Sequence, residues 1–205
     1  MLARTASFCT SRSGHFDAFD QGISFFLPNM TWLQPPGHVH AMIASTRQPN
    51  ALAAAVDDRR LSRAAATAAY PAVAVLPSPF LSVSAQASDD GAARVVRVVN
   101  PLAKPIGPNG TVTLELTITL GVGCSACATQ ALSHHDTSAA NPSWAPKLIS
   151  PASVPCKPAD GLYEGRSRVG APQLQFTEWT LPLTPLSYTV ASFTGCSTGV
   201  YSSVS

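Results

Sequence analysis

The sequence predicts a mainly β protein, in which an antiparallel β-sandwich follows a single strand–loop–helix unit. Two observations support this prediction. From residue 80 onward, several short segments alternate apolar with polar residues between turns, a pattern typical of half-buried strands in packed sheets. Closer to the N-terminus, an apolar run at 23–27 passes through a Pro-rich loop into an amphipathic stretch at 39–43 that suits a helix.

The strands of the sandwich can be recognised one by one. LSVSAQA and RVVRVVN flank Asp89-Asp90-Gly91, which is turn chemistry, so residues 81–100 predict a β-hairpin. TVTLELTITL, residues 111–120, directs five aliphatic residues to one face and four threonines with Glu115 to the other. LQFTEWTLPL and LSYTVASF are two later strand candidates.

These patterns divide the chain into five parts. Residues 1–19 are unassigned, residues 20–48 hold the strand–loop–helix unit, residues 49–79 form an Ala- and Pro-rich insertion, residues 80–194 form the sandwich, and residues 195–205 are a loose tail. The N-terminal MLARTASFCTSRSGHF contains Arg and Ser but no acid, as transit peptides do, although we favour an arbitrary start of a truncated chain.

Charge and hydropathy exclude two classes of partner. The chain has 13 basic and 11 acidic residues, and its Lys and Arg form no stripe that would follow a phosphate backbone. The mean hydropathy is +0.14, and no apolar run approaches the length needed to cross a bilayer. We therefore expect neither nucleic acid nor a membrane as a partner, and no pattern calls for a cofactor.

Two short motifs look catalytic but lack the context that their chemistry needs. GCSTG, residues 195–199, has the spelling of a hydrolase nucleophile elbow, yet only six residues follow it, too few for the required helix. GVGCSA, residues 121–126, follows a strand as a dinucleotide-binding loop does, but no crossover helix is predicted after it. We interpret the first as tail and the second as a loop at a strand end.

The cysteines favour disulfides over a metal site. A zinc site from the Cys124–Cys127 pair with His134 and His135 is disfavoured, because adjacent histidines on a strand or loop tend to point apart. We expect no metal. Four cysteines fall within the β region and allow three disulfide pairings, between which the sequence does not choose, and Cys9 is left over; the four are Cys124, Cys127, Cys156 and Cys196.

Disulfides would place the chain in the secretory pathway or outside the cell. Two N-x-S/T sequons, at Asn29 and Asn109, favour the same location as candidate glycosylation sites.

Several features of the β-rich part occur together in one order. A hairpin ends in VVN, the strand TVTLELTITL follows, and ALSHHDTSAANPSWAPKLISPASV then brings Asn141, Pro146, Ile149 and Pro151. The last strands read WTLPLTPLSYTVASF. In this combination, roughly residues 80–194 resemble the C-terminal domain of family-51 α-L-arabinofuranosidases, which implies a jelly-roll-like C-terminal sandwich.

The resemblance also implies a role for the N-terminal unit. In that family a TIM barrel precedes the sandwich, and DQGISFFLPNMTWLQPPGHVHAMI is similar to its eighth strand, the following loop and the eighth helix. The other barrel units are missing from the chain, so the missing TIM-barrel domain is an implied partner. Apolar residues shaped for it should then be exposed, namely Ile23, Phe25, Phe26 and Met42.

The resemblance assigns no catalytic residue to this chain. Retaining glycosidases need two carboxyl groups about 5 Å apart. In the family these are glutamates on the fourth and seventh barrel strands, upstream of the residues present. Glu115, Glu164 and Glu178 lie in a strand, a Gly-rich loop and a late strand, and nothing in the sequence gathers two of them in a cleft.

The loop after the eighth strand lies at the catalytic face of such barrels. Asn29, Trp32 and Gln34 are therefore candidates to line a sugar site in a complete enzyme, with Trp32 stacking on a ring and the amides binding hydroxyls. The alternative is that Trp32 packs against the helix and that Asn29 is a turn or glycosylation residue. For His38 and His40 we expect structural roles.

Two functions from different classes follow. The first is the C-terminal domain of an α-L-arabinofuranosidase that acts on arabinan- or arabinoxylan-type polysaccharides, inactive alone. The second is a non-catalytic β-sandwich that binds carbohydrate. Binding modules expose rows of aromatic residues, whereas Trp144 and Trp179 are isolated and aromatics are 7% of the chain, which favours the first.

Overall fold

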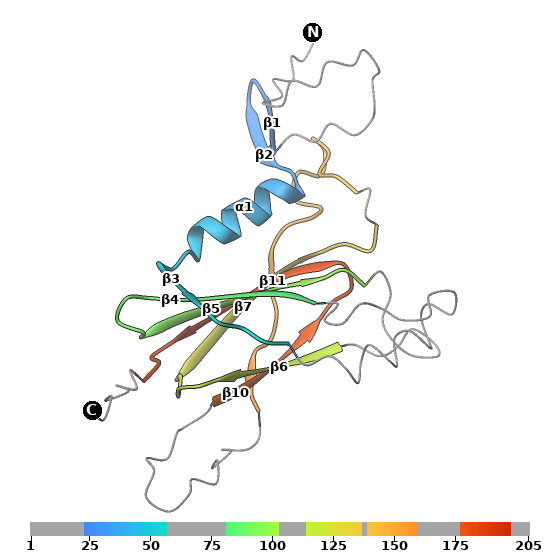
Figure 1. Ribbon diagram of the computed structural model, residues 1–205. Coiled ribbons are helices and arrows are strands. Elements are labelled where there is room, and N and C mark those ends of the chain that lie inside the picture. The colour runs from blue at the N-terminus through green and yellow to red at the C-terminus, as the bar shows by residue number, and fades with distance from the viewer. Residues whose placement is uncertain (1–22, 57–80, 103–113, 137–138, 160–176, 198–205) are drawn as a thin grey trace, which may run out of the picture.

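The computed structural model describes residues 23–56, 81–102, 114–136, 139–159 and 177–197. Within these residues there are two packed β-sheets, and a separate hairpin and one helix lie at one end of them (Figure 1). Every strand pair is antiparallel. The predicted mainly β, antiparallel fold is confirmed, and none of the described helices is long and apolar enough to span a membrane.

The N-terminal unit differs from the predicted strand–loop–helix. β1 (Ser24–Leu27) turns at residues 28–29 and pairs with a second strand, β2 (Met30–Leu33), before α1 (Pro35–Ser45) begins. The predicted loop is therefore mostly strand and helix. The physical reason is that Pro35 and Pro36 occupy the first helical positions, where a missing backbone N–H removes no helical hydrogen bond.

The larger sheet has six strands in the order β3-β4-β5-β11-β7-β8. The turn between β4 and β5 is closed by Gly91, whose φ of 70° suits glycine, and by Asp90, which accepts hydrogen bonds from the Ser88 hydroxyl and the Ala92 amide. The strands are β3 (Asn50–Leu52), β4 (Ser82–Ala87), β5 (Ala93–Asn100), β7 (Ala126–Ser133), β8 (Ala152–Ser153) and β11 (Ser187–Thr194).

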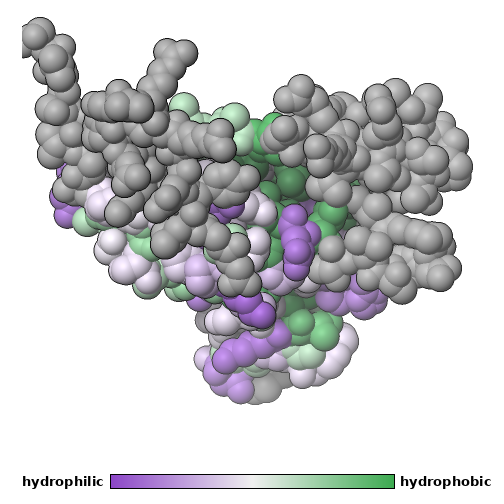
Figure 2. All heavy atoms as spheres, turned by 90° about the horizontal axis from the view of Figure 1, so that it is seen from below, coloured by the Kyte–Doolittle hydropathy of each residue, from purple (hydrophilic) through white to green (hydrophobic). Residues whose placement is uncertain are grey.

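The smaller sheet has three strands in the order β6-β10-β9, with β6 at Leu114–Leu120, β9 at Lys157–Pro158 and β10 at Thr177–Leu183. As the alternation predicted, Leu114, Ile118 and Leu120 are buried while Glu115 is exposed. Figure 2 shows the molecule from below, where both hydrophilic and hydrophobic residues reach the surface.

The predicted hairpin and the two late strands are present as β4–β5 and β10–β11. Among the described residues, five strands were not predicted: β2, β3, β7 and the two-residue strands β8 and β9. β3 lies inside the expected insertion, most of which (57–80) is outside the described residues, and it pairs with β4. β7 was not predicted, because its Ala-rich sequence ACATQALS lacks the β-branched and aromatic residues that signal a strand.

Two apolar layers hold these elements together. Between the sheets, Phe193, Leu181, Leu183 and Val98 are almost completely buried. On the other face of the larger sheet, Met42 of α1 packs in a second cluster with Val95, Leu132, Ile149 and Val190. Met42 is 3% exposed, so the prediction that it faces a missing domain is wrong, whereas Ile23 is 51% exposed as expected.

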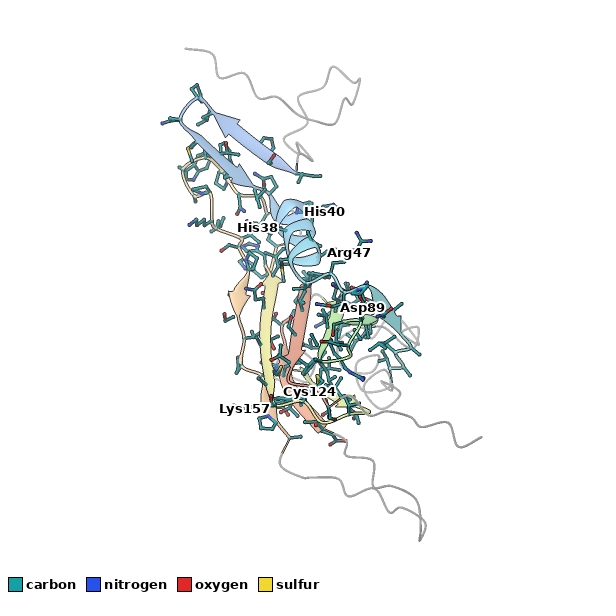
Figure 3. All side chains as sticks on the ribbon, turned by 90° about the vertical axis from the view of Figure 1, so that its left-hand side faces the viewer. His38, His40, Arg47, Asp89, Cys124 and Lys157 are labelled. Atoms are coloured by element: carbon teal, nitrogen blue, oxygen red, sulfur yellow. A yellow bond between two sulfur atoms is a disulfide. The ribbon has the colours of Figure 1, made fainter. Side chains whose placement is uncertain are left out.

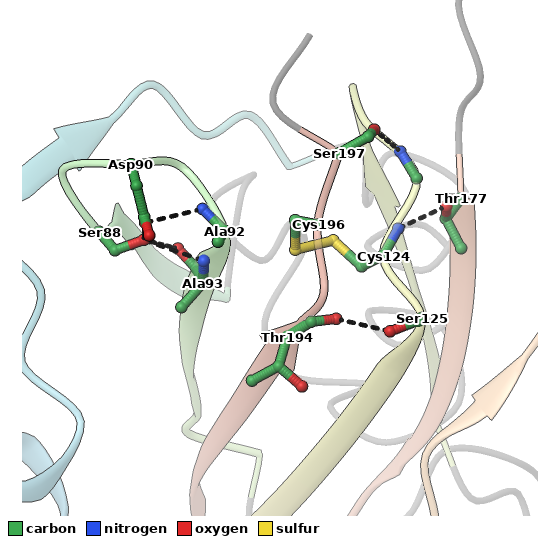
Figure 4. Close-up of a disulfide and its surroundings, with 11 residues drawn as sticks. Ser88, Asp90, Ala92, Ala93, Cys124, Ser125, Thr177, Thr194, Cys196 and Ser197 are labelled. Atoms are coloured by element: carbon green, nitrogen blue, oxygen red, sulfur yellow. Dashed lines mark hydrogen bonds between the residues drawn. A yellow bond between two sulfur atoms is a disulfide. The ribbon is translucent and has the colours of Figure 1, made fainter.

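The four cysteines of the β region form two disulfides, which pair Cys124 with Cys196 and Cys127 with Cys156. Figure 4 shows the first of them at the end of β11, where Ser125 donates a hydrogen bond to the Thr194 carbonyl. Residues 195–197, which we assigned to a loose tail, are therefore anchored to the sandwich. The Ser197 amide also donates to the carbonyl of Gly123.

Candidate functional site

The β1–β2 hairpin positions the three predicted sugar-lining residues differently. Asn29 is exposed in the turn. Trp32, on β2, is half-buried, and its ring centroid lies 5.8 Å from that of Phe25. Gln34 precedes α1 and is only 3% exposed, so it has little surface to offer a ligand.

A polar network centred on Asn141 joins the hairpin to the loop between β7 and β8. The backbone carbonyl of Asn141 accepts hydrogen bonds from Trp32 Nε1 and Gln34 Nε2, both at 2.7 Å, and its amide donates to Gln34 Oε1 at 2.9 Å. The Asn141 side chain, 1% exposed, donates from Nδ2 to the carbonyls of Leu33 (2.9 Å) and Ile149 (2.8 Å), while Oδ1 accepts from the Ile149 amide at 2.6 Å.

This network favours the structural interpretation of Trp32 and Gln34. The indole N–H and both ends of the Gln34 amide are bound to the backbone of Asn141. Buried polar groups satisfied in this way fix one geometry, because breaking any of them leaves a partner unpaired. Asn29 is the predicted lining residue that stays open to solvent. Of the glycosylation candidates, Asn109 lies outside the described residues.

The described carboxylates do not form a glycosidase pair. Glu178 pairs in register with Thr119, whose hydroxyl bonds its carboxylate at 3.3 Å, and Glu115 lies four residues from Thr119 along β6. With about 3.3 Å per residue, Glu115 and Glu178 are roughly 13 Å apart along the sheet, well beyond the ~5 Å of a retaining pair. Glu164 lies outside the described residues.

The histidines are distributed over separate places. His38 lies on α1, where burial lowers its pKa, and Figure 3 shows His40 on the same helix. His134 and His135 stack with ring centroids 4.4 Å apart, and Nδ1 of His134 accepts from the Asp136 amide. Among the described residues, no group of three His, Cys, Asp or Glu side chains is placed to hold a metal ion.

Sequence reasoning missed a charged groove on the outer face of the larger sheet. Arg97, on β5, is 7% exposed; its Nη1 donates to Gln86 Oε1 at 2.8 Å and its Nη2 to the Thr46 carbonyl at 2.9 Å. Thr46 caps the C-terminus of α1, where a cation is favoured by the helix dipole. Nothing in RVVRVVN distinguishes Arg97 from the ordinary polar residue of a strand.

We call the space above this side chain the Arg97 groove. It measures about 390 Å³, and its lining includes Arg47, Ser82, Ser84, Gln86 and Tyr188. The Tyr188 hydroxyl is buried without a hydrogen-bond partner among the described residues. Burial raises the pKa of Tyr188, and the nearby Arg97 charge acts in the opposite direction.

The fold is similar to part of several solved arabinofuranosidases. The α-L-arabinofuranosidase of Thermotoga maritima in complex with arabinose gives a TM-score of 0.54 at 18% identity, over 83% of this chain and 31% of that one. The family-51 enzyme of Thermotoga petrophila gives 0.53 at 15% identity, over 83% and 31%. The arabinose-bound MgGH51 α-L-arabinofuranosidase gives 0.52 at 11% identity, over 86% and 21%.

This similarity shows that the chain shares its fold with one part of these enzymes. Most of this chain matches less than a third of each of these three chains. No protein-family model and no curated protein sequence matches the chain.

Proposed function

We propose that this chain is the C-terminal part of a retaining α-L-arabinofuranosidase that removes terminal α-L-arabinofuranosyl residues from arabinan- or arabinoxylan-type polysaccharides. The supporting observation is that 83–86% of the chain has the fold of one part, 21–31%, of three such enzymes. In this proposal the sandwich braces a catalytic TIM barrel, and the acid/base and nucleophile carboxylates belong to that barrel.

The arrangement of carboxylates supports this division of roles. The described carboxylates are exposed or accept hydrogen bonds within a turn or between strands. Glu115 and Glu178 are too far apart to act on one glycosidic bond. A surface without a paired acid and nucleophile neither forms nor breaks a glycosyl-enzyme intermediate.

Activity measurements test the proposal. Expressed alone, the chain should hydrolyse an aryl α-L-arabinofuranoside no faster than buffer. Fused behind the barrel of a family-51 enzyme, it should support hydrolysis, and Glu115→Gln, Glu164→Gln and Glu178→Gln should leave the turnover of the fusion nearly unchanged. Hydrolysis by the isolated chain, or a large loss of turnover in a folded Gln variant, would place the chemistry in the sandwich.

One observation favours the alternative of a non-catalytic carbohydrate-binding sandwich. Trp144, in the loop between β7 and β8, is 86% exposed, and an exposed indole stacks well on a sugar face. If this function holds, the isolated chain should bind arabinan and Trp144→Ala should abolish binding, while Leu148→Ala, at a 57% exposed position of the same loop, should not. Equal affinities of the two variants would exclude it.

We also propose that the chain works in the secretory pathway or outside the cell. Two disulfides and the exposed sequon asparagine Asn29 support this location. Expression through a eukaryotic secretory pathway should add glycan at Asn29, detected as a mass shift that Asn29→Gln reduces. An unmodified Asn29 in the secreted protein would contradict its role as an acceptor.

A further inference from the structure

The Arg97 groove contains two guanidinium groups and none of the described carboxylates. Arg97 and Arg47 both line it. Arg47 is exposed just past the end of α1, as Figure 3 shows. The acids of the described residues all lie elsewhere, in the β4–β5 turn, on the smaller sheet and after β7: Asp89, Asp90, Glu115, Glu178 and Asp136.

The charge of Arg97 is only partly balanced. Its hydrogen bonds reach neutral acceptors, the amide oxygen of Gln86 and the carbonyl and hydroxyl oxygens of Thr46, and its Nε has no partner among the described residues. The helix C-terminus supplies about half an elementary charge of opposite sign. A buried cation is ordinarily paired with a full anion, so a positive potential remains in the groove.

The groove also offers groups that suit a sugar ring. Ser82 and Ser84 are exposed on the same face of β4, about 7 Å apart, and neither hydroxyl bonds a described residue. Val99, beside them on β5, is 42% exposed and provides an apolar contact. A few polar groups around an apolar contact are the usual make-up of a small-molecule site, and hydroxyl groups can pair with the hydroxyls of a sugar ring.

We propose that the Arg97 groove binds a uronic acid unit, with its carboxylate towards Arg47 and Arg97 and its ring hydroxyls towards Ser82 and Ser84. The carboxylate requirement comes from the unbalanced guanidinium charge, and the ring requirement comes from the serine hydroxyls and Val99. This inference does not depend on the proposed arabinofuranosidase function, because it uses no arabinofuranosyl contact and no residue of a missing barrel.

Calorimetric titration of the full chain tests the proposal with defined probes. D-galacturonate should bind at least about tenfold more tightly than D-galactose, the difference expected for one charge-assisted hydrogen bond. Arg47→Gln should weaken galacturonate binding by about tenfold for the same reason. Lys157→Gln removes the same charge at the lower end of the sheets, away from Arg47, and should change nothing (Figure 3).

Two further probes distinguish the sources of the carboxylate. An oligogalacturonide that binds more tightly than the monosaccharide supports a polysaccharide ligand, and tighter binding of the monosaccharide supports a free sugar acid. Tighter binding of a Glu-containing peptide than of either would overturn the sugar assignment in favour of a protein partner. Equal binding of galactose and galacturonate, or equal affinities of Arg47→Gln and Lys157→Gln, would overturn the proposal entirely.

A second variant tests the charge imbalance without any ligand. Ser84 lies opposite Arg97 in the β4–β5 register, so Ser84→Asp places a carboxylate beside the guanidinium. This variant should raise the melting temperature by about 2 °C over Ser84→Asn, its neutral isostere, and should abolish galacturonate binding. A Ser84→Asp chain that melts no higher than Ser84→Asn would show that the charge of Arg97 is already balanced.

Discussion

Replacing Asn141 by alanine should destabilise the protein more than any other single amide-to-alanine change in the described residues. Its side chain is 1% exposed and makes three hydrogen bonds, to the Leu33 carbonyl and to both backbone groups of Ile149. Alanine makes none of them. The three backbone groups then remain buried beneath the hairpin.

The magnitude follows from the groups left without partners. Each buried group that loses its hydrogen bond costs about 1–3 kcal/mol, so three should cost about 3–5 kcal/mol once some solvent relaxation is allowed. A domain of this size has a total stability of about 5–15 kcal/mol. The variant should therefore retain its fold but lose a large part of its free energy of unfolding.

Urea denaturation followed by circular dichroism measures the effect. The matched control is Asn50→Ala, which removes an exposed amide that, among the described residues, bonds the Asp89 carboxylate alone. This change should cost no more than about 0.5 kcal/mol. Amide hydrogen exchange should also accelerate in β1 and β2, because Asn141 is the joint between the hairpin and the sandwich. If the two variants unfold at the same urea concentration, the network does not stabilise the fold.

Two other changes test other parts of the fold. Cys196→Ser opens a loop of 72 residues, and the loss of that constraint should cost about 4 kcal/mol by chain entropy. Wild-type protein in reductant should lose more stability than this variant, because reduction also opens the Cys127–Cys156 disulfide. An unchanged urea midpoint of the variant would contradict the Cys124–Cys196 disulfide. Gly37→Ala should cost about 1–3 kcal/mol despite the better helix propensity of alanine, because the added Cβ would meet the Ile23 carbonyl. Gly121→Ala is the control: its Cβ would meet nothing within 4 Å, so this variant should have the wild-type melting temperature. Equal melting temperatures of these two alanine variants would show that the helix start tolerates the extra methyl.

The strands of the sandwich were predictable where the alternation of residues is strong. β6 and the β4–β5 hairpin follow from period-two patterns and from the Asp-Asp-Gly turn, both of which are local. β2 and β3 were missed because one lies between prolines and the other begins an Ala-rich stretch, so each is stabilised by its partner strand rather than by its own composition.

The site residues were less predictable, because their roles depend on contacts between distant segments. Gln34 bonds Asn141, 107 residues away, and Arg97 bonds Thr46, 51 residues away. Sequence patterns report the period of a strand or helix and the chemistry of a turn, whereas a buried polar contact depends on which elements the topology brings together. The sequence did not choose among the three disulfide pairings for the same reason, because the pairing depends on which segments the fold brings together.

The burial of Met42 also determines what removal of the N-terminal unit should do. Had its apolar residues faced only a missing domain, deleting residues 1–45 would improve solubility. Instead Val39 and Met42 cover Val95, Leu132 and Val190 of the larger sheet. Uncovering these three sheet side chains should cost about 5–9 kcal/mol, at roughly 1.5–3 kcal/mol for each.

The deletion should therefore abolish the cooperative melt. Met42→Ala should cost about 2–5 kcal/mol. Ile43→Ala, at the next position, should cost less than about 1 kcal/mol, because the Ile43 side chain is 38% exposed. A deletion variant that melts cooperatively at the wild-type temperature would mean that the helix belongs to another domain. The loss of the melt would mean that α1 is part of the sandwich core, whichever partner its exposed side meets.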